Sequence, residues 1–285
     1  MGKGAGAQAA PELCRAASGA GTLWARALAV LLCLAALLCL AAPLCCADRA
    51  LAQADRGQPS TAAPLTVDLE IVLAVDASAS VDKGEFRLQL RGIAAAFRAP
   101  DVRAAIRSGV HRRVAVALNI WADATIPKQR TPWFVLRSDA QIERFANHVE
   151  RLKRKVAGGT GIGSGIADAI RMINTNRIHG LRKVVDVSGD GKETASREEL
   201  SLTLPTALAM ALSNNVVVNG LAIRNEVPDL ATYYRRNVIE GTGAFVIEAR
   251  DYRDFARAMR LKLVREIASP LVRVREPKRL SRVVR

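Results

Sequence analysis

Apolar runs that end in small polar residues recur along this chain, and segments of helical periodicity lie between them. Leu69–Val75 is the clearest run, and such a run is typical of a strand buried in a parallel sheet. The strands predicted in this way cover residues 69–75, 114–121, 132–136, 184–188, 216–223 and 244–247. The predicted helices cover residues 83–97, 140–155, 163–174, 198–213 (interrupted near Pro205) and 254–267. Strands that alternate with helices predict a doubly wound α/β fold, with a mostly parallel central sheet and helices on both faces.

Oxygen-bearing side chains follow the first predicted strand at a regular spacing. Asp76, Ser78 and Ser80 stand at i, i+2 and i+4, so an extended strand end directs one carboxylate and two hydroxyls the same way. Ligands of open α/β sheets bind outside the carboxyl ends of the strands, and hard oxygen donors there suit Mg²⁺. The triplet therefore indicates a magnesium site, although taken alone it is also typical of a polar turn.

Two further loops extend this pattern into a family resemblance. Gly-Gly-Thr occurs within Gly158–Gly165, and the strand predicted at 184–188 runs into Asp190-Gly191. Asp-x-Ser-x-Ser, Gly-Gly-Thr and Asp-Gly in this order resemble the metal-ion-dependent adhesion site (MIDAS) of von Willebrand factor A domains. The resemblance covers about Val67–Ile267 and implies a Rossmann-like, doubly wound fold in which the three loops meet at one end of the sheet. It also implies a set of Mg²⁺ or Mn²⁺ ligands, some acting through water: Asp76, Ser78, Ser80, Thr160 and Asp190.

Shorter stretches look like one bacterial family of exported von Willebrand A-like proteins of unknown function. They are V-D-L-E-I-V-L-A-V-D at 67–76, E-F-R-L-Q at 85–89, D-V-S-G-D-G at 186–191 and G-A-F-V at 243–246. Ala79 stands where the wider family usually has glycine, which is a strained choice if that loop needs a positive φ. The glycines of 158–165 are expected to let the backbone approach the metal while Thr160 points inward.

The N-terminus has the composition of a secretory signal peptide. Basic residues precede the apolar segment Ala27–Ala42, and Ala52-Gln53-Ala54 is an A-x-A cleavage signal. This predicts a signal peptide at 1–54, a linker at 55–66, a von Willebrand A-like domain at 67–268 and a basic tail at 269–285, in a periplasmic or secreted protein. The alternative is an uncleaved membrane anchor, because the 21 residues of 27–47 carry no charge and are long enough to span a bilayer.

Cysteine usage and charge narrow the range of partners. All five cysteines precede the cleavage site, so the mature chain has no means of forming disulfides, a catalytic thiol or a cysteine-zinc site. The mature chain keeps 38 basic and 25 acidic residues, and this net charge of +13 favours an acidic partner. Nucleic acid is not expected, because the basic residues are dispersed and few aromatic residues lie among them. The tail Arg273–Arg285 is equally consistent with contact to an anionic membrane surface and with an unattached end.

These features favour a non-enzymatic, exported module in which a divalent cation bridges to an acidic residue of a partner protein. The alternative is a metal-dependent hydrolase or phosphatase on the same cluster, which needs a positioned general acid or base. Asp186 is the one candidate for that role, but an unpaired carboxylate in an apolar strand is costly, so we expect it to be hydrogen-bonded or to support the ligands indirectly. A structural domain with a vestigial site is a third alternative. No P-loop, G-x-G-x-x-G or G-x-S-x-G motif occurs.

Cleavage after Ala54 predicts an exported protein that begins at Asp55 and contains no cysteine. Intact mass spectrometry of the exported protein measures this, because the mature mass must exclude residues 1–54. As a control, a thiol-alkylating reagent should add no mass. A mass that retains Cys45 or Cys46, with or without lipid, would indicate an anchored protein instead.

Overall fold

A mostly parallel sheet forms the centre of the computed structural model, which describes residues 64–194 and 202–268. The strands are β1 Leu65–Val67, β2 Leu69–Asp76, β3 Val114–Trp121, β4 Gln129–Arg130, β5 Phe134–Leu136, β6 Ile178–Gly180, β7 Lys183–Gly189, β8 Val217–Ile223 and β9 Val246–Ala249. The main sheet has the order β4-β3-β2-β7-β8-β9, and β5 also pairs with β3. β2, β3, β7, β8 and β9 are parallel, whereas β4 and β5 run antiparallel to β3. β1 and β6 form a separate parallel pair.

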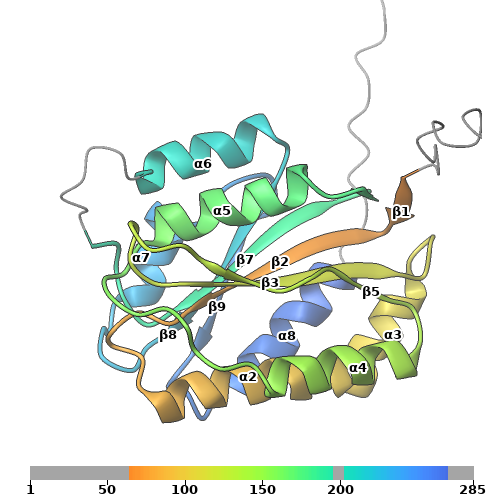
Figure 1. Cartoon of the computed structure of the whole chain (residues 1–285), viewed down its shortest axis with the longest axis horizontal. Helices are drawn as coiled ribbons and strands as arrows, with labels where there is room; N and C mark the ends of the chain where they lie inside the picture. Colours follow the sequence, from red (N-terminus) through yellow and green to blue (C-terminus); the bar gives the residue numbers. More distant parts are fainter. Residues whose placement is uncertain (1–63, 195–201, 269–285) are drawn as a thin grey trace, which may run out of the picture. The chain divides into compact units, whose positions relative to one another are not determined.

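Helices cover both faces of the main sheet (Figure 1). They are α2 Lys83–Arg98, α3 Pro100–Ser108, α4 Asp139–Glu150, α5 Ile162–Asn174, α6 Leu204–Ser213, α7 Leu230–Asn237 and α8 Phe255–Ala268. The helices α2, α3, α4 and α8 lie on one face, and α5, α6 and α7 lie on the other. The predicted doubly wound, mostly parallel α/β fold is therefore confirmed.

The unbroken apolar run of β2 follows from this two-sided cover. Leu73 and Val75 pack into the hydrophobic cluster shared with α2 and α8, whereas Val72 and Ala74 pack into the cluster shared with α5. Successive strand residues point to opposite faces, and here each face is buried, so every position of β2 is buried. β2 pairs with β3 on one side and β7 on the other, so the Asp76 end of the strand lies inside the sheet.

Some predicted boundaries differ from the structure. The helix predicted over 140–155 ends at Glu150, because the segment that follows exchanges hydrogen bonds with Gln129 instead of with its own preceding turn. Gln129 Nε2 donates to the carbonyl of Lys153 and its Oε1 accepts from the amide of Lys155. The last strand covers 246–249 and not 244–247, because the Phe245 amide donates to a side chain, Asn219 Oδ1, at 3.0 Å.

Pro205 starts a helix and does not interrupt one. It lies in the first turn of α6, where a helix needs no amide donor, and the Thr203 side chain caps that turn. The earlier part of the helix predicted over 198–213 falls in 195–201, outside the described residues. The sequence patterns also miss α3 and α7. In α7 the apolar stripe is narrow, since Leu230, Ala231 and Tyr234 are its buried residues.

The predicted signal peptide and basic tail lie outside the described residues, and β1 begins at Leu65, within the predicted linker. Across residues 64–194 and 202–268, none of the helices combines the length and the apolar character needed to cross a membrane.

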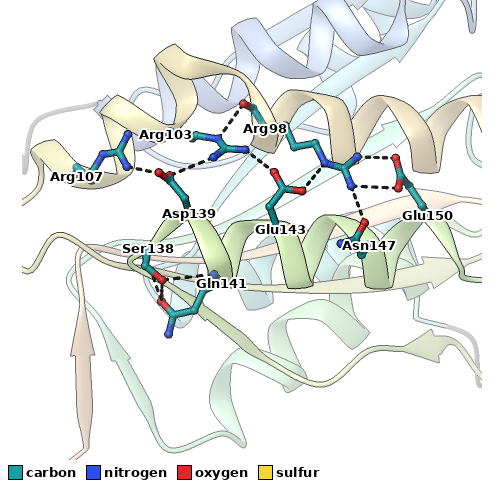
Figure 2. Close-up of polar contacts among 9 residues, drawn as sticks. All are labelled: Arg98, Arg103, Arg107, Ser138, Asp139, Gln141, Glu143, Asn147 and Glu150. Atoms are coloured by element: carbon teal, nitrogen blue, oxygen red, sulfur yellow. Dashed lines mark hydrogen bonds and ion pairs between the residues drawn. The ribbon is translucent and has the colours of Figure 1, made fainter.

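Arginines at the junction of α2 and α3 form a line of ion pairs with acidic residues of α4 (Figure 2). Arg98 Nε lies 2.9 Å from Glu143 Oε2, and Arg98 Nη1 lies 2.6 Å from Glu150 Oε1. Arg103 pairs with the other oxygen of Glu143, so this carboxylate joins both helices to α4. The side chains are partly exposed, so each pair stabilises the fold only slightly, and their joint effect is to orient α4 along α2.

A buried cluster of charged groups fastens α8 to the sheet. The Lys262 side chain is fully buried, and its Nζ lies 2.6 Å from Glu266 Oε1 and 2.9 Å from Asp186 Oδ1 of β7. Asn219 Nδ2 of β8 donates to the same Glu266 oxygen at 3.0 Å. Burial and the charge of Glu266 raise the pKa of Asp186, and the nearby ammonium of Lys262 opposes them. This ion pair accounts for a carboxylate in an otherwise apolar strand.

Replacing Lys262 by Ala should lower the free energy of unfolding by about 3–5 kcal/mol, because it leaves two buried carboxyl groups without their cation. Urea unfolding at pH 7.5 measures the change. Lys153→Ala is the matched control, since Lys153 is exposed and surface substitutions stay within about 0.5 kcal/mol. Equal losses in the two variants would contradict the role given to the cluster.

Candidate metal centre

Two loops that leave the carboxyl end of the sheet, and the loop that leads into α5, come together beside β2 and β7. In the sheet register, Val75 of β2 lies opposite Ser188 of β7, so the residues that follow both strands are neighbours. Gln89 Nε2 of α2 donates to the Asp76 carbonyl at 2.9 Å, and the Asp82 side chain caps the start of that helix. The end of β2 is therefore held by both the sheet and a helix.

Four of the five predicted site residues form one continuous chain of hydrogen bonds. The amide of Ser78 donates to Asp76 Oδ1 at 2.7 Å. Ser78 Oγ and Ser80 Oγ are 3.2 Å apart, and Ser80 Oγ donates to Asp190 Oδ1 at 2.8 Å. The Asp-x-Ser-x-Ser segment and the Asp-Gly loop thus meet across the end of the sheet, although 110 positions separate Ser80 from Asp190.

Backbone hydrogen bonds bring the fifth residue, Thr160, to the same place. The amide of Ala79 donates to the carbonyl of Gly158 at 2.8 Å, and the amide of Thr194 donates to the carbonyl of Thr160 at 2.9 Å. Thr160 Oγ1 lies 3.4 Å from the point where a Cβ on Gly191 would stand. The three loops therefore meet at this end of the sheet, with Thr160 beside Gly191, and the role of the five residues as metal ligands stays a prediction.

The glycine-rich loop serves helix packing more than access to a metal. Gly158 has a φ of +120°, which side chains rarely adopt, so it forms the turn. A Cβ on Gly163 would stand 2.5 Å from the backbone nitrogen of Leu204, and one on Gly165 would stand 2.7 Å from the Trp121 ring. Ala79 is not strained, since the described non-glycine residues with positive φ are Arg112 and Asn215.

Two buried carboxylates with unused oxygens dominate the electrostatics of this site. Asp76 is 0% exposed and Asp190 is 2% exposed, and the Oδ2 atom of each has no hydrogen-bond partner. Burial, together with the charge of Asp190, raises the pKa of Asp76 to about 7, and the Ser78 amide opposes this shift. Two such groups side by side are unfavourable unless a cation or a proton compensates their charge.

The donor set fits a hard divalent cation. Asp76 and Asp190 supply carboxylate oxygens, and three hydroxyls lie beside them, which suits Mg²⁺ or Mn²⁺ better than a soft metal. No three His, Cys, Asp or Glu side chains gather to hold a metal anywhere in 64–194 or 202–268. A metal site here would therefore need hydroxyl ligands in addition to the two carboxylates, and the sequence predicts Ser78, Ser80 and Thr160 for that part.

Two tyrosine hydroxyls belong to the same region and were missed by the sequence patterns. Tyr234 of α7 and Tyr252 of the segment before α8 are buried, and neither hydroxyl has a hydrogen-bond partner. Helical periodicity did not predict α7, and no local spacing relates either tyrosine to Asp76. These residues become visible only once the helices are packed on the sheet.

Comparisons with known proteins find one family and several similar structures. The model of a family described as "Protein of unknown function (DUF1194)" matches residues 66–271. The pilus adhesin SpaC from Lactobacillus rhamnosus GG is similar at 13% identity and a TM-score of 0.48, over 72% of this chain and 31% of the adhesin. Proximal thread matrix protein 1 from the mussel byssus, described with a zinc-occupied MIDAS motif, is similar at 13% identity and a TM-score of 0.44, over 72% of this chain and 48% of that protein. No curated protein matches the chain.

A smaller protein matches over nearly its whole length. The SpRpn10 VWA domain has 14% identity and a TM-score of 0.42, over 66% of this chain and 93% of that domain. The doubly wound, mostly parallel α/β sheet that the sequence predicts is seen in the strand order of the chain itself. The chain spans less than half the length of the adhesin and of the thread matrix protein, and likenesses of this size transfer neither a site nor a partner to it.

The metal-free protein should lose stability as the pH rises. Asp76 has a folded pKa of about 7 against an ordinary value of 3.8, so the folded state binds this proton more tightly than the unfolded state. The stabilisation is complete below about pH 4 and is lost as the pH rises through about 7, with a slope of at most about 1.4 kcal/mol per pH unit. Urea unfolding in EDTA at pH 5, 6, 7 and 8 measures it.

Asp76→Asn removes the titrating group and is the control for this series. Its free energy of unfolding should depend less on pH than that of the wild type, and the remaining slope belongs to other groups such as Asp186. Identical slopes for the two proteins would contradict the assignment to Asp76.

Proposed function

The chain belongs to the family described as "Protein of unknown function (DUF1194)", and we propose a function for it from the geometry of its site. We propose that it is an exported, non-enzymatic binding module in which Mg²⁺ or Mn²⁺ bridges to an acidic residue of a partner protein. The observation that carries the proposal is the pair of buried carboxylates, Asp76 and Asp190, whose Oδ2 atoms have no partner.

The proposed ligands each have a definite part. Asp76 and Asp190 would hold the ion and offset its double positive charge, while Ser78, Ser80 and Thr160 would supply hydroxyl oxygens. When bound, the ion supplies a coordination position that a Glu or Asp carboxylate from a partner can occupy. The hydrogen bonds between the three loops hold these side chains in place before binding.

The charge and predicted location of the chain support an acidic protein partner. The mature net charge of +13 would steer an acidic surface toward the domain and raise the association rate. We propose that the protein acts in the periplasm or outside the cell, with the uncleaved anchor as the alternative. The basic tail is proposed to contact an anionic membrane surface if the domain acts near one.

A hydrolase or phosphatase is less well supported. Asp186, the candidate general base, is buried and ion-paired with Lys262. Burial raises the pKa of Glu193 to about 6, but its Oε2 accepts the Gly163 amide at 3.1 Å and so caps the start of α5. Both carboxyl groups are committed to structural contacts, and neither is placed to move a proton at the site.

Metal binding is tested by thermal and urea unfolding with Mg²⁺ or with EDTA. Saturation at about 100 times Kd should stabilise the wild type by about 2.7 kcal/mol. Asp190→Ala should abolish this gain and leave the stability in EDTA within about 1 kcal/mol of the wild type, because it removes one hydrogen bond from Ser80 but also a charge beside Asp76.

Asp229→Ala is the matched control, since Asp229 is exposed and pairs with Lys192. It should keep the full response to Mg²⁺. Capture of a protein from periplasmic or envelope extract should require Mg²⁺ and fail with Asp190→Ala. Unfolding curves of the wild type that superimpose in Mg²⁺ and EDTA, with no heat in titration calorimetry, would overturn the proposal.

A further inference from the structure

Among the described residues, four of the buried oxygen atoms that lack a hydrogen-bond partner concern the metal centre. They belong to two carboxylates and two phenols: Asp76 Oδ2, Asp190 Oδ2, Tyr234 OH and Tyr252 OH. A buried phenol normally has an acceptor, and a buried carboxylate oxygen normally has a donor. Here two carboxylate acceptors and two phenol donors each lack a partner, which indicates that the phenols and the carboxylates are related to one another.

Tyr234 reaches the site from the face of the sheet covered by α5, α6 and α7. It is 0% exposed and packs in the cluster of that face. A Cβ on Gly189 would stand 2.7 Å from the Tyr234 hydroxyl and also 2.7 Å from Asp76 Oδ2. The two oxygens therefore lie on the same side of β7, and the missing side chain of Gly189 leaves the room between them.

Tyr252 reaches the site from the opposite face. It lies in the segment between β9 and α8, is 3% exposed and packs in the cluster that contains α2 and α8. Burial, followed by the charges of Asp190 and Asp76, raises the pKa of the Tyr252 hydroxyl. Burial, followed by the charges of Asp76 and Asp190, raises the pKa of Tyr234. An ordinary phenol has a pKa of about 10, so each hydroxyl is a donor at neutral pH.

We propose that Tyr234 and Tyr252 are positioning residues of the metal centre, whose hydroxyls donate to the Oδ2 atoms of Asp76 and Asp190, directly or through one ordered water. This inference rests on the proposed metal-binding function. The two donors would lower the repulsion between the carboxylates and fix their orientation from both faces of the sheet. Hydrogen bonds that orient ligands in this way commonly change metal affinity by about 10–100-fold.

The experiment compares Tyr234→Phe, Tyr252→Phe and the double variant with the wild-type protein. Mg²⁺ affinity is measured by titration calorimetry, and Tb³⁺ affinity by sensitised luminescence. Trp121 lies opposite Asp76 in the sheet and remains in every variant, so the Tb³⁺ signal survives loss of the tyrosines. Each single variant should weaken binding of both ions by about 10-fold or more, and the double variant should weaken it further.

The neighbouring Tyr233 provides the matched control. Its hydroxyl accepts the Glu193 amide at 3.1 Å, so Tyr233→Phe removes a structural hydrogen bond on the same helix. This variant should melt at a lower temperature with and without metal and keep the wild-type Kd. Tyr234→Phe and Tyr252→Phe should instead weaken binding of both ions, because each removes a donor proposed for a ligand carboxylate.

The outcomes separate this inference from the function on which it rests. A wild-type protein that binds neither Mg²⁺ nor Tb³⁺ overturns both. A wild-type protein that binds, with Phe variants that bind equally tightly, overturns the role of the tyrosines and leaves the metal centre standing. Phe variants that are destabilised in EDTA and unchanged in Kd assign the two hydroxyls to the fold alone, which also contradicts the proposal.

Discussion

The burial of two carboxylates at the ends of adjacent strands is the constraint on which the rest of this structure depends. Asp76 and Asp190 sit where β2 and β7 leave the interior of the sheet, with helical layers on both sides. Each keeps one oxygen in a hydrogen bond, from Ser78 or Ser80, and one without a partner. Two like charges that are both buried and adjacent repel each other strongly. A positive charge beside Asp76 and Asp190 would therefore stabilise this end of the sheet.

The same domain contains a second pair of buried carboxyl groups with its own solution. Asp186 and Glu266 share the ammonium of Lys262, and this internal cation fastens α8 to the sheet. Within the described residues, no lysine or arginine is paired in this way with Asp76 or Asp190. The Lys262 cluster is closed and structural, whereas the Asp76 and Asp190 pair, in our proposal, would take its cation from solution.

If the proposed centre takes an external ion, partner binding would be conditional on that ion. The three loops are joined by hydrogen bonds such as that from the Ala79 amide to the Gly158 carbonyl, so the proposed binding of an outside carboxylate would require little reorganisation. The carboxyl groups that could move a proton, Asp186 and Glu193, are instead engaged by Lys262 and the start of α5. The site is preformed, and the carboxyl groups that could act as a general acid or base are engaged elsewhere. For these two reasons we propose a binding function for the chain instead of a hydrolytic one.

The sequence alone determined the alternating strands and helices, the doubly wound fold and the three motifs, because periodicity and motif spacing are local properties of the chain. Tertiary structure alone decided the partner of Asp186, since Lys262 lies 76 positions away in the sequence. Tertiary structure also puts Tyr234 and Tyr252 in the hydrophobic clusters of opposite faces of the sheet. It packs the Trp121 ring against Gly165, where a side chain would clash with it. Which distant side chains meet depends on how the helices pack on the sheet, and no local pattern encodes that packing.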